Sequence, residues 1–180
     1  MATFFTSDTH FGHSNIRRFA KRPHKRTKHM DADMIAKWNE RVGKDDVVWH
    51  LGDFGFHSTA EQLNPILGQL QGTINVVLGN HDYNPDLETT AYWRINQFFE
   101  YKKILVNSQA IVLCHYPLQE WDGSFRGSWH LHGHSHNQWP QSPWKRLDVG
   151  VDGHGFYPWS FEELKAVMDT RQPQNPSIYR

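Results

Sequence analysis

The stretch that decides the fold is TFFTSDTH, residues 3–10. Its adjacent phenylalanines and β-branched threonines predict a short buried strand over residues 3–7. The strand ends at a carboxylate and an imidazole, those of Asp8 and His10. Because residues two apart in an extended chain point to the same side, these two side chains can share one target. The stretch therefore predicts a buried strand that delivers polar, ligand-type groups to its carboxyl end.

The same arrangement recurs along the first half of the chain. Apolar strands are expected over residues 46–51 and 74–78, each followed by glycine and polar residues. Helical spacing of apolar residues is found over residues 31–42 and 58–70. Alternating strands and helices are typical of an α/β fold with parallel strands, whose carboxyl ends meet at one edge where ligands bind.

The second half of the chain predicts further strands. Residues 101–106 and 110–114, joined by Asn107-Ser108, are typical of a β-hairpin. Shorter strands are expected near residues 129–131 and 146–149. The pattern therefore changes from parallel strands with helical connections to antiparallel pairing in the hairpin.

Capping residues mark where two of the helices begin. Ser58, with Glu61 three residues later, has the spacing of a capping box and is expected to open the helix over residues 58–70. Ser160 is expected to cap a closing helix over residues 161–168.

The composition limits the classes of protein that this chain can represent. Its 180 residues carry 19 Lys and Arg against 19 Asp and Glu, with 13 histidines and a single cysteine. One cysteine excludes an intramolecular disulfide and a multi-cysteine zinc site, and fits a cytoplasmic protein. The absence of a bilayer-length apolar run predicts no membrane partner. A single domain over residues 1–171 is expected, followed by a frayed tail over residues 172–180. The surplus of histidine points to metal binding or proton transfer.

Candidate metal ligands follow five of the predicted strands. They are Asp8, His10, Asp53, Asn80, His115, His134 and His136. These oxygen and imidazole donors suit two divalent cations that share a bridging carboxylate. Two such cations about 3.5–4 Å apart can activate water and stabilise a transferring phosphoryl group. His81 is a spare imidazole next to the cluster, and with Asp82 beside it His81 suits proton transfer to a leaving group.

The motifs, taken in this order, resemble those of the calcineurin-like metallophosphoesterase superfamily. They are Asp8-x-His10, Gly52-Asp53, Gly79-Asn80-His81-Asp82, His115 and Gly133-His134-Ser135-His136, and they cover the chain from residue 7 to residue 136. The resemblance implies an α/β fold with a two-sheet sandwich of mixed strands, flanked by helices. It also implies two divalent metal ions, usually Mn²⁺ in bacterial members, with Fe or Zn²⁺ as alternatives. Residues 7–16 resemble the opening of a small bacterial and phage branch.

The resemblance also implies a division of the ligands. One metal would be held by Asp8, His10, Asp53 and His136, and the other by Asp53, Asn80, His115 and His134. Asp53 would then bridge the two metals, and His81 would be the catalytic histidine. The family often has Gly-Asp-x-x-Asp at the second motif, whereas this chain has Phe56 in place of the second acid. That acid is not a direct ligand in the family, so its loss affects the hydrogen bonds around the site.

Residues that follow the first motif are candidates for contact with the substrate. They are His13, Asn15 and Arg17. Arg17 also begins a basic run that ends at Lys28, which is typical of a solvated loop but can also steer a phosphate-rich substrate. Trp121 and Trp139 are candidates for stacking on a nucleobase.

Three functions are consistent with these residues. The first is a binuclear metal-dependent phosphoesterase that hydrolyses phosphate mono- or diesters, of a small molecule or a nucleotide, by attack of a metal-bound hydroxide. The second is a nucleic-acid-processing phosphodiesterase or nuclease that uses the basic run at residues 17–28. The third is a non-catalytic binding module on the same fold, against which the complete set of seven donors argues. Ester class, native metal and oligomeric state stay open at this point.

Overall fold

Strand β1, Thr3–Thr6, lies inside a five-stranded sheet in a computed structural model that describes residues 1–55, 59–82 and 94–174. The strand order is β4-β3-β2-β1-β9. Strands β2 (Val47–His50), β3 (Thr73–Val77) and β4 (Ile95–Phe99) continue the sheet in parallel from β1. The short strand β9, Trp159–Ser160, pairs with the other edge of β1 in antiparallel orientation.

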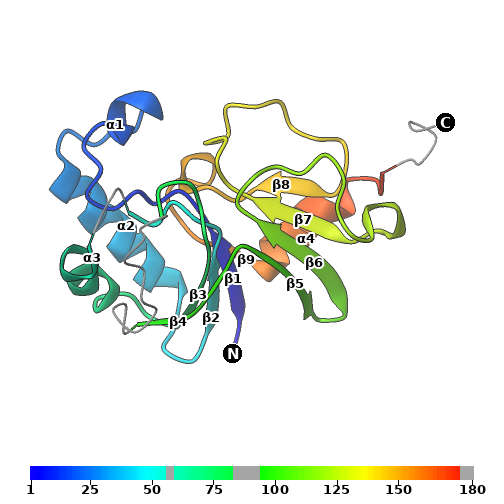
Figure 1. The fold of residues 1–180 in the computed structure, drawn as a ribbon, viewed down its shortest axis with the longest axis horizontal. Helices are drawn as coiled ribbons and strands as arrows, with labels where there is room; N and C mark the ends of the chain where they lie inside the picture. Colours follow the sequence, from blue (N-terminus) through cyan, green and yellow to red (C-terminus); the bar gives the residue numbers. More distant parts are fainter. Residues whose placement is uncertain (56–58, 83–93, 175–180) are drawn as a thin grey trace.

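A second sheet of four strands packs against the first (Figure 1). Its order is β5-β6-β7-β8, with bounds Tyr101–Val106, Gln109–Cys114, Trp129–His132 and Arg146–Asp148. Strands β5 and β6 form the antiparallel hairpin, while β6, β7 and β8 run parallel. The two sheets and their flanking helices confirm the predicted mixed α/β sandwich.

The hairpin turn shows why its two central residues are Asn107 and Ser108. Their φ angles are 48° and 67°, so both lie in the left-handed region that a type I′ turn requires. The twist of this turn matches that of the strands it joins, and asparagine tolerates this conformation better than most residues.

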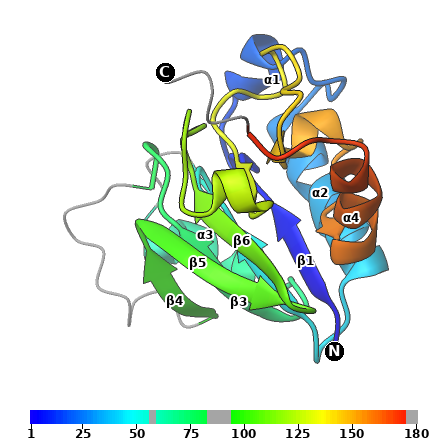
Figure 2. The ribbon, with the colours of Figure 1, turned by 90° about the vertical axis from the view of Figure 1, so that its right-hand side faces the viewer.

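Helices cover the outer face of the first sheet and the side of the sandwich. Their bounds are Ile16–Phe19 for α1, Thr27–Arg41 for α2, Ala60–Leu67 for α3 and Phe161–Asp169 for α4. Helices α1, α2 and α3 lie on one side of the five-stranded sheet, and α4 lies beside the second sheet (Figures 1 and 2). Short 3₁₀ turns cover Ser124–Arg126 and Val151–Gly153.

Two apolar cores form because β1 is buried on both faces. Phe4 packs with α2 residues such as Met34 and Trp38, in the core between the first sheet and its helices. Phe5 points the other way and packs with residues of the second sheet and α4, such as Leu131 and Leu164. A strand covered on both sides carries apolar residues on both faces, as the adjacent Phe4 and Phe5 do.

The boundaries of α2 and α3 differ from the sequence prediction, and α3 ends at Leu67, three residues before its predicted end. Helix α2 begins at Thr27, four residues before the predicted start. The capping box of α3 is made by Thr59 and Gln62: the Thr59 side chain accepts from the Gln62 N–H, and the Gln62 side chain accepts from the Thr59 N–H at 3.0 Å. The predicted pair Ser58 and Glu61 is therefore wrong, because the same spacing recurs one residue later; Ser58 itself lies outside the described residues.

The last described residues are bound to the body of the protein. Gln172 pairs with Trp144, and the Gln174 N–H donates to the Ser124 carbonyl at 3.2 Å. Contrary to the expected fraying from residue 172, the chain is therefore held as far as Gln174. In the described ranges, no helix combines the length and the apolar character that crossing a membrane requires.

The capping box of α4 yields a test of the fold. Ser160 accepts from the Glu163 N–H at 3.2 Å, and the Ser160 N–H donates to the Glu163 carboxylate at 2.9 Å. We expect Ser160→Ala to lower the free energy of unfolding by about 1 kcal/mol, because the first turn of the helix loses its side-chain acceptor. Urea denaturation measures the change. The control is Ser14→Ala, an exposed serine; equal unfolding free energies for the two variants would contradict the capping role.

Candidate metal centre

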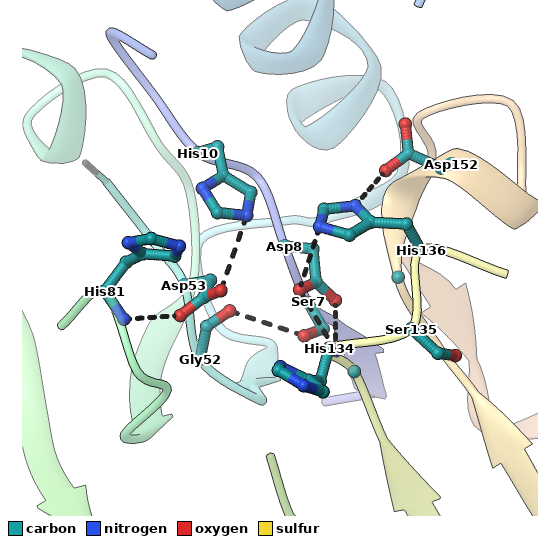
Figure 3. Close-up of polar contacts among 12 residues, drawn as sticks. Ser7, Asp8, His10, Gly52, Asp53, His81, His134, Ser135, His136 and Asp152 are labelled. Atoms are coloured by element: carbon teal, nitrogen blue, oxygen red, sulfur yellow. Dashed lines mark hydrogen bonds and ion pairs between the residues drawn. The ribbon is translucent and has the colours of Figure 1, made fainter. Parts of the chain in front are cut away.

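The carboxyl ends of β1, β2, β3, β6 and β7 meet at one edge of the sandwich, and the predicted ligands follow them. Figure 3 shows five of these ligands gathered there: Asp8, His10, Asp53, His134 and His136. Asp8 and His10 follow β1, and Asp53 follows β2. The residues that reach the same place from β3, β6 and β7 are Asn80, His115, His134 and His136. The structure therefore brings all seven predicted donors together.

The backbone at the site is strained at five of these donors. Their φ angles are 57° at Asp8, 49° at His10, 55° at Asp53, 69° at His134 and 47° at His136. Such angles are uncommon for residues other than glycine and cost about 1–3 kcal/mol each. They persist because the surrounding structure holds the turns in place, which is a feature of functional sites.

Asp53 lies between the other donors. Its Oδ2 is 3.4 Å from His10 Nε2 and 3.6 Å from His115 Nε2, so one oxygen faces an imidazole on each side. Its Oδ1 accepts from the His81 N–H at 2.8 Å. This is the position that a bridging ligand between two cations requires.

The first group of donors consists of Asp8, His10 and His136, whose ligand atoms lie within 4.8 Å of one another. His136 Nε2 is 3.9 Å from Asp8 Oδ1, and the His10 and His136 rings stack at 5.2 Å. Both oxygens of Asp8 accept from the His134 N–H at 3.1 Å. The carboxylate is thereby oriented by the turn that carries two other ligands.

The second group of donors surrounds Asn80. Its Oδ1 lies 3.2 Å from His115 Nε2 and 3.0 Å from His134 Nδ1. His115 Nδ1 lies 2.7 Å from the Leu51 carbonyl, which can only accept, so the proton sits on Nδ1 and Nε2 presents a lone pair to the site. This tautomer is the one that a metal ligand requires.

Burial gives the site unusual electrostatics. It raises the pKa of Asp8 to about 8, although the adjacent His136 opposes the rise. Burial also lowers the pKa of His10 far below its usual range, and it lowers the pKa of His134. Burial therefore favours the neutral form of both imidazoles, which is the form that binds a metal.

One buried atom tests whether the donors fit a cation. Among the residues that the structure describes, none is a hydrogen-bond partner for the buried His10 Nε2, even though this atom points at Asp53. A buried polar atom with no partner costs about 1–3 kcal/mol, and a cation between His10 and Asp53 would satisfy both. Carboxylate, amide oxygen and imidazole donors together suit Mn²⁺, Fe or Zn²⁺. The residues present thus fit the implied metals.

Two further histidines line the same site. The His81 ring lies 5.2 Å from the His10 ring and is only partly buried. His13 is buried, with its Nδ1 3.4 Å from His10 Nδ1 and its ring 6.1 Å from that of His81. Burial lowers the pKa of His13 to about 4. Of the predicted substrate contacts, His13 is therefore inside the site.

The carboxylate of Asp82 joins two of the ligand turns. It accepts from the N–H groups of Asp53 at 2.6 Å, Phe54 at 2.8 Å and Gly79 at 2.8 Å. Burial raises the pKa of Asp82 to about 6. A Cβ on Gly79 would lie 2.3 Å from Asp53 Oδ1, so only glycine permits this close approach. Asp82 thus holds the backbone around Asp53, in addition to standing beside His81 in the sequence.

Asp152 and Arg22 are site residues that the sequence analysis did not identify. Asp152 Oδ2 accepts from His136 Nδ1 at 2.8 Å, and the Arg22 guanidinium makes two bonds to the same carboxylate, at 2.8 and 3.0 Å. Arg22 also donates to the carbonyls of Asp8 and Thr9, at 2.6 and 2.9 Å. Arg22 is therefore buried in the site, and its assignment to a solvated basic run is wrong.

A signal for Asp152 does exist in the sequence. Val149-Gly150-Val151-Asp152 follows β8 and repeats the pattern of strand, glycine and acid that is found at the end of β2. Burial alone would raise the pKa of Asp152, but the bonds from His136 and Arg22 outweigh it and hold the pKa low. The charged carboxylate in turn raises the pKa of His136 against the effect of burial.

The remaining candidates lie elsewhere. Asn15 is exposed at the start of α1. The Arg17 guanidinium donates to the carbonyls of Ser14, His24 and Lys25, so it braces the loop that follows the first motif.

The two tryptophans proposed for base stacking differ in exposure. Trp121 is buried, and its Nε1–H donates to Ser128, so its role as a stacking residue is wrong. Trp139 is 56% exposed. Phe56, where the family has a second acid, lies outside the described residues.

Comparisons with known proteins identify a family and a fold. Residues 1–145 match the calcineurin-like phosphoesterase superfamily domain. The uncharacterized protein MJ1445 of Methanocaldococcus jannaschii is 30% identical over 174 residues, which cover 92% of this chain and 90% of the relative. The gene 66 protein of Mycobacterium phage L5 is 28% identical over 185 residues, covering 85% and 87%. The crystal structure of AQ665, a protein of unknown function from Aquifex aeolicus, has the same fold, with a TM-score of 0.73, 22% identity and coverage of 92% and 98%.

The buried pair of Arg22 and Asp152 yields a stability prediction. Their side chains are 0% and 7% exposed, so Asp152→Ala leaves a buried guanidinium without its counter-charge. We expect the free energy of unfolding to fall by about 3–5 kcal/mol. Chemical denaturation measures it, with Asp122→Ala, which breaks an exposed pair with Lys103, as the control. A loss no larger than that of the control would show that the buried pair does not hold the site together.

Proposed function

The chain belongs to the calcineurin-like phosphoesterase superfamily, and on this premise we propose that it is a metal-dependent hydrolase of phosphate mono- or diesters. One observation carries the proposal: six donor side chains gather around Asp53, and within the described residues the buried Nε2 of His10, which faces this carboxylate, has no hydrogen-bond partner. A complete donor set favours catalysis over a non-catalytic binding module, in which ligands are expected to be lost.

We assign the donors to two cations. The first would be held by Asp8, His10, Asp53 and His136, and the second by Asp53, Asn80, His115 and His134. Such a pair, when bound, supplies Lewis-acid stabilisation of the phosphoryl oxygens and a water nucleophile at neutral pH. Asp53 would bind both cations, since its Oδ2 faces His10 in the first set of ligands and His115 in the second.

Neighbouring groups orient the ligands. Asp152 accepts the proton of His136 Nδ1, which leaves the lone pair of Nε2 for the cation. The Leu51 carbonyl does the same for His115. Asp82 is a positioning residue, because its carboxylate holds the N–H groups of the turn that carries Asp53.

His81 is the group that we propose for proton transfer. Its backbone N–H is held by Asp53 Oδ1, and its partly exposed ring stands next to the first group of donors. From there it can donate a proton to the oxygen of the leaving alcohol or hydrogen-bond a phosphoryl oxygen. His13, beside His10 and His81, is placed to contact the bound phosphate.

The bridging role of Asp53 is tested by Asp53→Asn. We expect the variant to retain less metal than the wild type, and hydrolysis of aryl phosphate mono- and diesters to fall by at least about 10³-fold, because both cations lose a shared anionic ligand. Elemental analysis of the purified protein is combined with the two activity assays. Asp45→Asn, at an exposed position, is the control. Unchanged metal content and turnover in Asp53→Asn would refute the bridge, and a metal-loaded wild type inert on every phosphate ester would refute the proposed function.

The role of His81 is tested separately by His81→Gln. We expect turnover to fall about 10²- to 10⁴-fold, the usual contribution of general acid–base catalysis, while metal content stays at the wild-type level. Steady-state kinetics and elemental analysis on the same preparation give both numbers, and His29→Gln, an exposed histidine, is the control. Loss of metal in His81→Gln would mean that His81 is a ligand.

A further inference from the structure

We propose that a rim beside the metal centre binds single-stranded nucleic acid, which makes an oligonucleotide the substrate class of the proposed phosphoesterase. The rim consists of α1, the basic segment after it, and the loop that follows His136. The cleavage step rests on the proposed function, whereas binding by the rim does not.

Charge on this side of the molecule is concentrated and uncompensated. Residues 9–30 contain no acid, although the whole chain is neutral. Five basic side chains of this segment are exposed: Arg18, Lys21, Lys25, Arg26 and Lys28. None of them has an ion-pair partner in the part of the chain that the structure describes. A neutral protein thus presents one cationic surface, next to a site built for phosphate.

The fold places this surface at the metal centre. Helix α1 begins three residues after His13, and its buried Ile16 anchors it to the core. The loop after His136 meets α1 where Gln138 Nε2 lies 3.4 Å from the Phe19 carbonyl. Both segments lie together at the same end of the molecule (Figure 2). They therefore form one continuous edge of the site.

Exposed aromatic rings accompany the charge. Phe19 on α1 is 68% exposed, and Trp139 in the loop after His136 is 56% exposed. Tyr116 is 46% exposed, with its ring 5.0 Å from that of His115 and 4.9 Å from that of His134. One exposed aromatic residue needs no explanation, but three around one cationic site favour a ligand with flat apolar faces.

Single-stranded nucleic acid offers both features that the rim can recognise. Its phosphates repeat along the strand and match a row of basic side chains, while its unpaired bases stack on aromatic rings. A duplex hides these faces, and an anionic membrane needs a longer amphipathic helix than the four residues of α1. The charge and the rings together therefore favour the single strand.

The reaction follows from this placement. A strand bound along the rim brings one phosphodiester to the metal centre. Water adds a hydroxyl group to phosphorus, the P–O bond to one sugar oxygen breaks, and the other proton of the water ends on that oxygen by way of His81. The products are two shorter strands, one of them carrying the phosphate.

The charge of the rim is tested by the triple variant Arg18→Gln, Lys21→Gln, Lys25→Gln. Fluorescence anisotropy follows a labelled oligothymidylate or oligouridylate of about 12 nucleotides, with EDTA present so that no hydrolysis competes. At about 50 mM salt we expect the affinity to fall at least about tenfold. We also expect the plot of the log association constant against log salt concentration to become less steep by about 2, since each lost phosphate contact removes about 0.7 from the magnitude of its slope. Thermal unfolding confirms that the variant is folded.

A matched triple variant controls for net charge. Lys44→Gln, Arg126→Gln and Lys165→Gln remove three positive charges elsewhere on the surface. The control should bind with wild-type affinity and salt slope. Equal losses in the two triple variants would overturn the rim, because binding would then follow net charge alone.

The aromatic part is tested by Trp139→Ala. Loss of one stacked base predicts an affinity about 5- to 150-fold lower with an unchanged salt slope. Leu105→Ala, which removes an exposed apolar side chain from β5, is the control. If Trp139→Ala binds the oligonucleotide with wild-type affinity, Trp139 does not stack on a base.

Two outcomes separate this inference from the proposed function. If wild-type protein hydrolyses bis(p-nitrophenyl) phosphate but does not bind either oligonucleotide, or binds only anionic phospholipid vesicles, the rim proposal is overturned and the phosphoesterase stands. If the rim-dependent binding is found but the metal-loaded protein cleaves no phosphate ester, the rim is supported and the phosphoesterase is overturned.

Discussion

The carboxylate of Asp53 is the point on which the rest of the site depends. It stands at the end of a strand in one sheet and faces histidines from β1 and from the second sheet, His10 and His115. Its backbone is held in turn by Asp82, which ties the β2 turn to the β3 turn. The two sheets must therefore pack at one relative position for the donors to meet, and the core between them sets that position.

This arrangement costs stability in the absence of a cation. Five donors have left-handed backbone angles, and the site buries neutral imidazoles against acids such as Asp8, whose pKa is raised to about 8. Compensation comes from hydrogen bonds to backbone groups and from the buried pair of Arg22 and Asp152. A divalent cation would offset most of the remaining cost, so metal binding and folding should reinforce each other.

The sequence predicts features that involve residues close together in the chain, but not contacts between residues that are far apart in it. Each of the seven donors stands within a few residues of its strand, so motif order and strand order together predict that the donors lie at one edge of the sheet. The Arg22–Asp152 pair spans 130 residues, and no local pattern joins them. The sequence places Asp82 only as the neighbour of His81, because its three hydrogen bonds from backbone N–H groups have no signature in the sequence. The pairs Ser58–Glu61 and Thr59–Gln62 both have the spacing of a capping box, so the sequence pattern does not choose between them. In the structure, Thr59 caps α3.

The most direct measurement of the central claim is anomalous X-ray diffraction from crystals of the protein grown with Mn²⁺. The account predicts two anomalous peaks about 3.5–4 Å apart, with the Asp53 carboxylate between them. His10 and His136 should contact one peak, and His115 and His134 the other. A single peak, or peaks that Asp53 does not touch, would contradict it.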